Sequence, residues 1–229
     1  MTTGIIGAMQ TEVEALHADM KNASRTDIAG ISFYTGELYG QPAVVAKCGV
    51  GKVFAAVCAQ IMILRFGVGQ ILNTGVAGTL TDRLGQLDIA LASAVAQHDM
   101  DTSPVGDPVG MISGINVIEI AASEKINTAL ASAAAEAGIR TLSGVIASGD
   151  QFIADPARKA FIRDTFGAVA CEMEGAAIGQ VCYINRIPFA IIRSISDSAT
   201  GDAGMEYPEM VKKAAARSAD LIRRYLSRL

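Results

Sequence analysis

Carboxylate side chains recur where apolar segments of the chain give way to polar ones. The four that stand out are Glu12, Glu172, Glu174 and Asp197. In the sequence, only Arg193 stands near them to balance their charge. A charged side chain is expensive to bury at the end of a strand unless a ligand or partner satisfies it. An acidic pocket suits a substrate that is rich in hydroxyl groups and reacts through a cationic transition state.

Two of these carboxylates also have a purely structural explanation. Glu12 would stabilise the start of a helix, because a negative charge is favoured near the positive end of the helix dipole. Asp197 would cap a helix or pair with Arg193. We favour a shared site, because three separate strand ends carry carboxylates and ligands in open α/β sheets collect where strands end and helices begin.

Two glycine-containing motifs match nucleotide-binding sequences only in part. G-I-I-G-A-M at 4–9 lacks the G-x-G-x-x-G spacing of a dinucleotide site. G-V-G-K at 49–52 lacks the rest of a phosphate-binding loop, so we interpret it as a turn from a strand into a helix. We therefore expect neither a nicotinamide or flavin cofactor nor an ATPase.

Histidines and cysteines are few and widely spaced. His17 and His98 are far apart and lack partners at metal-ligand spacing apart from Asp99, so we expect no metal site. The four cysteines form no C-x-x-C pair and are interpreted as thiols of the core.

The composition is that of a globular α/β protein. Hydrophobic residues make up 51% of the 229 residues and charged residues 18%, which excludes a disordered chain. The net charge of −4, with no basic run, argues against nucleic-acid binding. The longest apolar stretch, 53–64, is well short of the roughly 20 residues of a membrane span. We expect no membrane helix, no secretory signal and a cytoplasmic location.

Short β-branched segments alternate with helix-length periodic ones. Strands are predicted at 4–9, 31–34, 42–48, 70–74, 88–95, 116–118, 141–147, 168–172 and 188–196. Helices are predicted at 10–20, 52–66, 122–137, 156–165, 173–185 and 207–226. The connection at 35–40 is too short for a crossover, so its two strands are antiparallel. The pattern predicts an α/β fold with a mixed sheet, in one domain over 1–229.

The least regular segment is 97–115, which contains five proline and glycine residues. An irregular segment of this length is uncommon inside a compact domain unless it has a function. We predict a functional or interface loop here.

Five motifs in order carry a family resemblance. They are G-I-I-G-A-M-x-x-E-V at 4–13, N-T-G-x-A-G at 73–78, S-G-D-x-F-I at 148–153, E-M-E at 172–174 and R-x-I-S-D at 193–197. In these motifs, over nearly its whole length, the chain resembles the bacterial 5′-methylthioadenosine/S-adenosylhomocysteine nucleosidases of the purine nucleoside phosphorylase-like superfamily. The resemblance implies a three-layer α-β-α sandwich around a mixed sheet, a homodimer, and no metal or cofactor.

The resemblance also implies roles for individual residues. Glu12 would be the general base that activates water, and Asp197 the acid that protonates adenine N7. These roles suit the chemistry, because cleavage of an N-ribosidic bond builds positive charge on the sugar and negative charge on the base. Ser196 would orient Asp197, and Glu174 would hold the ribose hydroxyls.

Further residues would contact the substrate. Arg193 and Met173 would flank the sugar, Phe152 and the backbone of Ile153 would form the adenine platform, and Met9 and Val50 would contact the 5′ substituent. Gly78 falls on a matching glycine turn, and the predicted substrate-binding set also includes Val76 and Glu172.

The chain departs from the family pattern at three places. Val76 stands where serine is common, and Q-T at 10–11 stands where acidic residues are common. The segment 98–106 replaces an aromatic-rich loop that closes the partner's 5′-alkylthio pocket in the resembling dimers. Asp99 and Asp101 still fit that pattern. The 5′ group of the substrate therefore stays open.

We predict a nucleosidase that releases adenine and a thioribose from 5′-methylthioadenosine and S-adenosylhomocysteine, for methionine salvage. A nucleosidase for another 5′-substituted adenosine or a deoxyfutalosine-type metabolite is an alternative. A purine nucleoside phosphorylase is another, although the charge of Glu12 would repel phosphate. A nucleoside-binding regulatory protein would be expected to have lost Glu12 or Asp197, and both are present.

Overall fold

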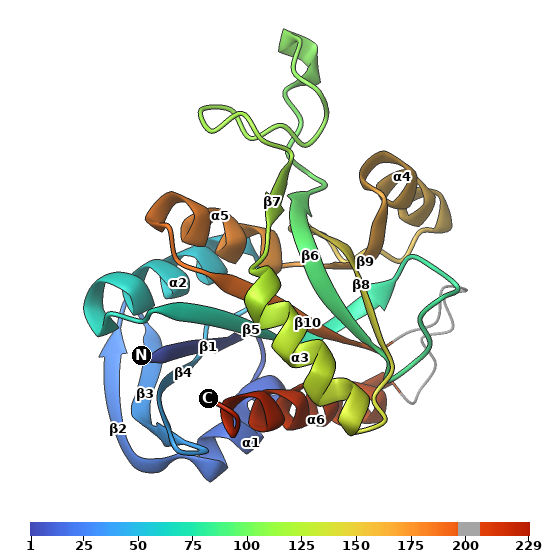
Figure 1. Cartoon of the computed structure of the whole chain (residues 1–229). Helices are drawn as coiled ribbons and strands as arrows, with labels where there is room; N and C mark the ends of the chain where they lie inside the picture. Colours follow the sequence, from blue (N-terminus) through green and yellow to red (C-terminus); the bar gives the residue numbers. More distant parts are fainter. Residues whose placement is uncertain (197–206) are drawn as a thin grey trace.

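The computed structural model describes residues 1–196 and 207–229. Its strands are β1 (Thr3–Gly7), β2 (Lys21–Ile28), β3 (Ile31–Leu38), β4 (Gln41–Lys47), β5 (Gln70–Thr79), β6 (Ile89–Gln97), β7 (Glu119–Ala121), β8 (Thr141–Ser148), β9 (Ala168–Glu172) and β10 (Phe189–Ile195). Its helices are α1 (Gln10–Asp19), α2 (Lys52–Phe66), α3 (Glu124–Glu136), α4 (Pro156–Phe166), α5 (Gly175–Asn185) and α6 (Tyr207–Leu226), with a short 3-10 turn, η1 (Ser103–Val105). This alternation confirms the predicted α/β class (Figure 1).

The described strands form one mixed sheet. Their order is β10-β6-β8-β9-β5-β1-β4-β3-β2, with β7 beside β6. β10 also pairs with β5, so five strands close into a ring while β1, β4, β3 and β2 extend from it. β1 lies parallel between β4 and β5, whereas β3 runs antiparallel to β4. The ring places the ends of β8 and β9 beside β5 and β10, where the pocket described below forms.

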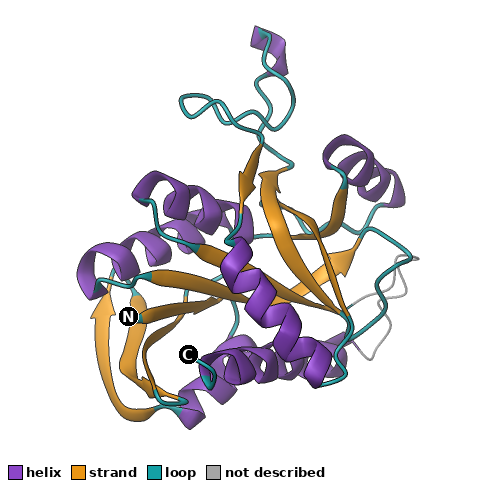
Figure 2. Ribbon diagram, in the orientation of Figure 1, coloured by secondary structure: helices purple, strands orange, loops and turns teal. Residues whose placement is uncertain are grey.

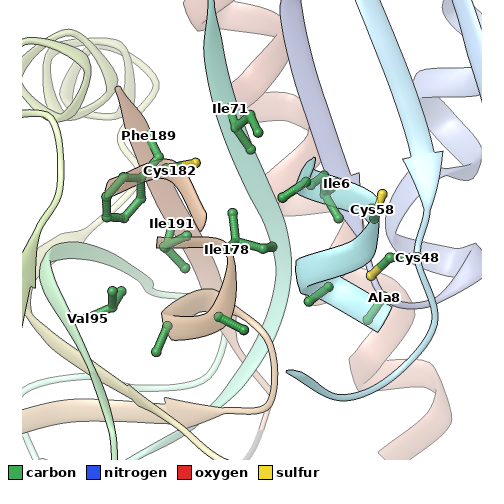
Figure 3. Packing of buried hydrophobic residues seen from close by; sticks show 14 of the residues in the cluster. Ile6, Ala8, Cys48, Cys58, Ile71, Val95, Ile178, Cys182, Phe189 and Ile191 are labelled. Carbon is green, nitrogen blue, oxygen red and sulfur yellow. The ribbon is translucent and has the colours of Figure 1, made fainter. Parts of the chain in front are cut away.

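Helices cover both faces of the sheet (Figures 1 and 2). α2 and α5 pack together on one face, and α1, α3 and α6 lie on the other. Alternate strand residues point to the two layers, because side chains of a strand alternate between faces. Ile6 and Ile71 belong to the cluster under α2 and α5, whereas Ile5 and Leu72 belong to the other cluster. Figure 3 shows part of the first cluster, including Ile178 of α5. The predicted α-β-α sandwich is confirmed.

β2 has no counterpart among the predicted strands. Its sequence, K-N-A-S-R-T-D-I, is polar and mostly exposed, and it pairs with β3 at the edge of the sheet. Alternating hydrophobicity marks a strand only when one face is buried. An exposed edge strand needs no such pattern, and charged side chains on it protect the edge from pairing with other chains.

The connection between β3 and β4 is a tighter hairpin than predicted. β3 continues to Leu38, and Tyr39 and Gly40 alone form the turn, with φ of 54° and 86°. Two successive residues with positive φ are typical of the type I′ turn, whose twist matches that of the flanking strands. The antiparallel pairing is confirmed, and the predicted turn boundaries are wrong.

β5 continues to Thr79 instead of ending at 74. The motif at 73–78 therefore lies inside the strand, and Gly78 pairs with Cys171 of β9. The expected glycine turn at Gly78 is wrong. Glycine and alanine have low strand propensity, but pairing with β10 and then with β9 keeps this stretch extended.

The segment after β6 projects away from the body of the molecule and returns as β7 (Figure 1). The strand predicted at 116–118 is displaced to Glu119–Ala121, because Asn116 has a φ of 54° and occupies a turn in which Val117 bridges to Ile112. The irregular character of 97–115 is confirmed beyond Gln97, which is the last residue of β6. Its role at an interface stays a prediction.

The structure also bears on the cysteines, on membrane-spanning helices and on metal-binding groups. All four cysteines are buried thiols. In the described parts of the chain, no helix combines the length and apolar character that crossing a membrane requires. Within those same parts, histidine, cysteine and carboxylate side chains form no group suited to hold a metal ion.

Candidate active site

One pocket collects the predicted site residues. Its cavity of about 230 Å³ is lined by Met9, Glu12, Val50, Val76, Gly78, Phe152, Ile153, Glu172, Met173, Glu174, Arg193 and Ser196. Ala8, Ala77, Gln151 and Cys171 line it as well, and the sequence analysis had not singled them out. Asp197 lies outside the described residues. Six separate segments thus contribute to one concave surface, at the edge where ligands of α/β sheets bind.

Glu12 lines the pocket as a buried residue in the first turn of α1. Its Oε2 accepts hydrogen bonds from the backbone amides of Ala8 at 2.7 Å and Met9 at 2.9 Å, and its Oε1 accepts one from Val76 at 3.2 Å. Burial raises the pKa of Glu12, and the Arg193 charge and these amides oppose the increase only in part. A carboxylate with a raised pKa is a stronger base, so Glu12 is suited to take a proton from water.

Arg193 is the buried cation of the site. It lies on β10 with 1% of its surface exposed and donates through Nη2 to Asn73 and Glu172, and at 3.4 Å to Glu174 Oε2. Among the residues that the structure describes, its Nε has no hydrogen-bond partner. A buried charge needs this degree of pairing to offset the loss of hydration. Arg193 therefore holds two carboxylates in the pocket wall.

Glu172 is occupied by protein donors. Its carboxylate accepts hydrogen bonds from the Ser148 hydroxyl, from Arg193, and from the amides of Glu174 and Gly175 at 2.9 to 3.0 Å. It lines the pocket, but these donors leave it little capacity for substrate hydroxyls. The geometry suits Glu172 to hold Arg193 and the start of α5.

Glu174 is the N-cap residue of α5. The sequence had predicted a helix from residue 173, so Glu174 was expected inside the helix and not before it. Its Oε1 accepts a hydrogen bond from the Gly51 amide at 2.8 Å, and Arg193 lies near its other oxygen. Burial and the negative charge of Glu172 raise the pKa of Glu174 to about 7, against the lowering effect of Arg193. With fewer protein donors than Glu172, Glu174 keeps acceptor capacity for a ligand with hydroxyl groups.

Gly75 is a site residue that the sequence analysis missed. A Cβ built on Gly75 would lie 2.1 Å from Arg193 Nη1 and 2.6 Å from Glu12 Oε1. Such distances are shorter than any real Cβ contact, so only glycine leaves room for these two side chains. The motif at 73–78 includes Gly75, but the sequence does not show which of its two glycines lies against other side chains.

The remaining wall of the pocket is mostly apolar. Met9, Val50 and Met173 contribute side chains, and Phe152 stands exposed at the rim. An apolar wall with a few convergent polar groups is typical of a small-molecule site. Glu12, Glu172 and Glu174 face a single guanidinium, so the polar part is acidic overall.

Comparison with known proteins agrees with this architecture. The model of the phosphorylase superfamily matches residues 2–227. The chain belongs to this superfamily. It is 38% identical to a 5′-methylthioadenosine/S-adenosylhomocysteine nucleosidase of Shewanella halifaxensis over 230 residues, which cover all of both chains. Membership of this nucleosidase family makes the chain an N-glycosyl hydrolase.

Two solved structures from Helicobacter pylori share the fold. One is a mutant of the 5′-methylthioadenosine/S-adenosylhomocysteine nucleosidase with 5′-methylthioadenosine in its active site, at a TM-score of 0.95 and 36% identity, with 100% of this chain and 99% of the other covered. The second is a futalosine hydrolase, at a TM-score of 0.95 and 35% identity, with 100% and 98% covered. The family resemblance predicted from the motifs is thus confirmed.

Proposed function

We propose that the enzyme hydrolyses the N-ribosidic bond of 5′-methylthioadenosine and S-adenosylhomocysteine, releasing adenine and the corresponding thioribose. The observation that carries this proposal is the buried Glu12 carboxylate, which faces Arg193 across Gly75 in the pocket that also holds Glu174. The full-length similarity to a nucleosidase named for these substrates supports it.

Glu12 acts as the general base. It takes a proton from a water molecule, and the water oxygen bonds to C1′ of the sugar as the bond from C1′ to N9 breaks. The electron pair of that bond goes to adenine, whose N7 is protonated by Asp197 in the role that the family resemblance implies. Negative charge at Glu12 and Glu174 stabilises the positive charge that develops on the sugar.

Glu174 holds the ribose. Its buried carboxylate accepts hydroxyl hydrogen bonds, which are charge-assisted and stronger than those between neutral groups. Met173 and Arg193 flank the sugar, while Phe152 and Ile153 contact the adenine. Met9 and Val50 face the 5′ substituent.

The charge balance of the pocket disfavours a phosphorylase. A phosphate dianion would need free cationic groups, whereas Arg193 is already shared among Glu172, Glu174 and Asn73. Two like unit charges 4 Å apart repel by roughly 4 kcal/mol at an effective dielectric constant near 20, which is about a thousandfold in binding. Phosphate therefore finds no productive position beside Glu12.

The test is adenine release from 5′-methylthioadenosine in phosphate-free buffer, with and without added phosphate. We expect adenine and free 5-methylthioribose at the same rate in both buffers. Strict dependence on phosphate, with a ribose 1-phosphate as product, would make the protein a phosphorylase and overturn the role of Glu12.

A second candidate substrate is a futalosine-type nucleoside. The similarity to the futalosine hydrolase structure favours it, as does the unusual segment 98–106. Competition between 5′-methylthioadenosine, S-adenosylhomocysteine and futalosine would decide, with kcat/KM for each as the readout. We expect the first two to be preferred.

We further propose that the enzyme is a homodimer. Apolar side chains project from the outer face of α2, where Val53 and Leu64 are three-quarters exposed and Phe54 is half exposed. Exposed apolar groups gathered on one element are typical of an interaction surface. Sedimentation of the parent and of Phe54→Glu tests this, with a dimer expected for the parent alone. The single domain over 1–229, the role in methionine salvage and the cytoplasmic location stay predictions.

A further inference from the structure

Three residues outside the pocket form a closed set of hydrogen bonds. The Lys52 amide donates to Asp150 Oδ1 at 2.7 Å, the Asp150 amide donates to Asp99 Oδ2 at 2.9 Å, and Lys52 Nζ donates to Asp99 Oδ1 at 2.6 Å. These bonds join the start of α2, the loop after β8 and the beginning of the projecting segment. We call Lys52, Asp99 and Asp150 the clasp.

The clasp lies directly behind the turn that contacts Glu174. Gly51 precedes Lys52 and donates its amide to Glu174 Oε1 at 2.8 Å. A Cβ on Gly51 would lie 3.0 Å from Asp150 Oδ1, so Asp150 packs against this turn. Successive amides of the turn are therefore held from two sides, one by the clasp and one by Glu174. The two amides are separated only by the Cα and the carbonyl carbon of Gly51, so a displacement of the Lys52 amide would also displace the Gly51 amide.

The Lys52–Asp99 ion pair of the clasp is largely shielded from solvent, whereas Asp150 is exposed, and the pair is joined to α5. The side chains of Lys52 and Asp99 are 19% and 16% exposed, so salt screens this ion pair less than a surface pair. Lys52 Nζ also donates to Gln97 at 3.0 Å, and Gln97 donates to Gln180 of α5 at 2.6 Å. Because Glu174 directly precedes the first residue of α5, the same network supports both the carboxylate and the helix that follows it.

We propose that Lys52, Asp99 and Asp150 are positioning residues that hold the Gly51 amide against Glu174, and thereby set the preference of the enzyme for ribosyl over 2′-deoxyribosyl substrates. The inference rests on the proposed function, in which Glu174 binds the ribose hydroxyls. None of the three is among the described residues that line the pocket. Their influence therefore acts through Gly51.

The test compares Asp150→Ala with Asp150→Asn. Alanine removes the acceptor of the Lys52 amide, whereas asparagine keeps an oxygen at the same place. Asp150 is exposed, so neither change places a cavity in the core. A hydrogen bond to a charged group corresponds to roughly 10-fold to 100-fold in an equilibrium, so we expect Asp150→Ala to lose about 10-fold in kcat/KM for 5′-methylthioadenosine. We expect its preference over the 2′-deoxy substrate to fall by at least about threefold, and Asp150→Asn to retain both.

Lys52→Met is the second arm, because it keeps the aliphatic stem and the backbone donor while removing the ammonium. Like Asp150→Ala, it should lower the ratio of kcat/KM for the ribosyl substrate to that for the 2′-deoxy substrate. Asp27→Asn is the matched control, since it breaks an exposed ion pair with Arg25 and should change nothing. Equal losses for both substrates in the two clasp variants, or no loss in either, would overturn the proposal.

A crystal structure of Asp150→Ala tests the geometry without any activity. We expect Gly51 N to move beyond hydrogen-bond distance of Glu174 Oε1, and an unchanged 2.8 Å would overturn the clasp. If the parent enzyme releases no adenine, the proposed function is wrong. The distance from Gly51 N to Glu174 Oε1 in Asp150→Ala still tests whether the clasp positions the Gly51 amide.

Discussion

Replacing Gly75 with alanine would disturb the two charged groups at the centre of the pocket. The new Cβ would lie 2.1 Å from Arg193 Nη1 and 2.6 Å from Glu12 Oε1, whereas ordinary contacts begin at 3.4 Å. Arg193 would have to move by about 1.3 Å and Glu12 by about 0.8 Å. A misplacement of about 1 Å in a catalytic site costs about 100-fold in rate, so we expect kcat/KM to fall by roughly that factor.

The same crowding also acts on stability. Forcing an extra carbon into a packed, buried site costs about 1–3 kcal/mol, and the Tm should decrease accordingly. Kinetics are therefore measured at a temperature where circular dichroism shows the variant to be folded. Gly85→Ala is the matched control, because the nearest atom to its Cβ is Asp88 Oδ2 at an ordinary 3.7 Å.

The assay is adenine release from 5′-methylthioadenosine by folded protein. If Gly75→Ala keeps kcat/KM within about threefold of the parent, the site tolerates displacement of both groups. The inference that their separation is critical would then be wrong. A similar loss in Gly85→Ala would show that the effect is not specific to the pocket.

Three further predictions concern the carboxylates. Glu12→Gln and Asp197→Asn keep shape but remove proton transfer, so each should lower kcat by about 10² to 10⁴ while nucleoside binding persists; a loss of less than about threefold would contradict the assigned role. Glu174→Ala should cut activity on 5′-methylthioadenosine severely. Removing the 2′-hydroxyl from the substrate should then lower the activity of this variant less than it lowers the activity of the parent, and an equal decrease in both enzymes would remove the proposed ribose contact. Burial raises the pKa of Glu12, and that of Glu174 to about 7, so kcat/KM should fall as the pH decreases through about 7, and a profile flat down to pH 5 would refute these shifts.

Several elements could be predicted from the sequence because their signal is local. β9 and α6 have the predicted boundaries, because the short apolar segment A-V-A-C and the 20-residue amphipathic helix can each be recognised from their own residue pattern. β2 could not be predicted, because an exposed edge strand has no apolar pattern. β5 was predicted too short, since strand pairing with β10 and β9 outweighs the low propensity of its glycines and alanines.

The sequence by itself determined the chemistry that the pocket contains. Its carboxylates, its arginine and their places at or near the ends of strands follow from residue type and local pattern, as does the alternation that makes the fold α/β. The tertiary structure alone decided how these groups act on one another. Arg193 donates a hydrogen bond to Glu172. Gly75 leaves the space in which Arg193 and Glu12 come close, although these two residues are more than a hundred positions apart in the sequence. Raised carboxylate pKa values need burial, and burial exists only once distant segments have packed and excluded water.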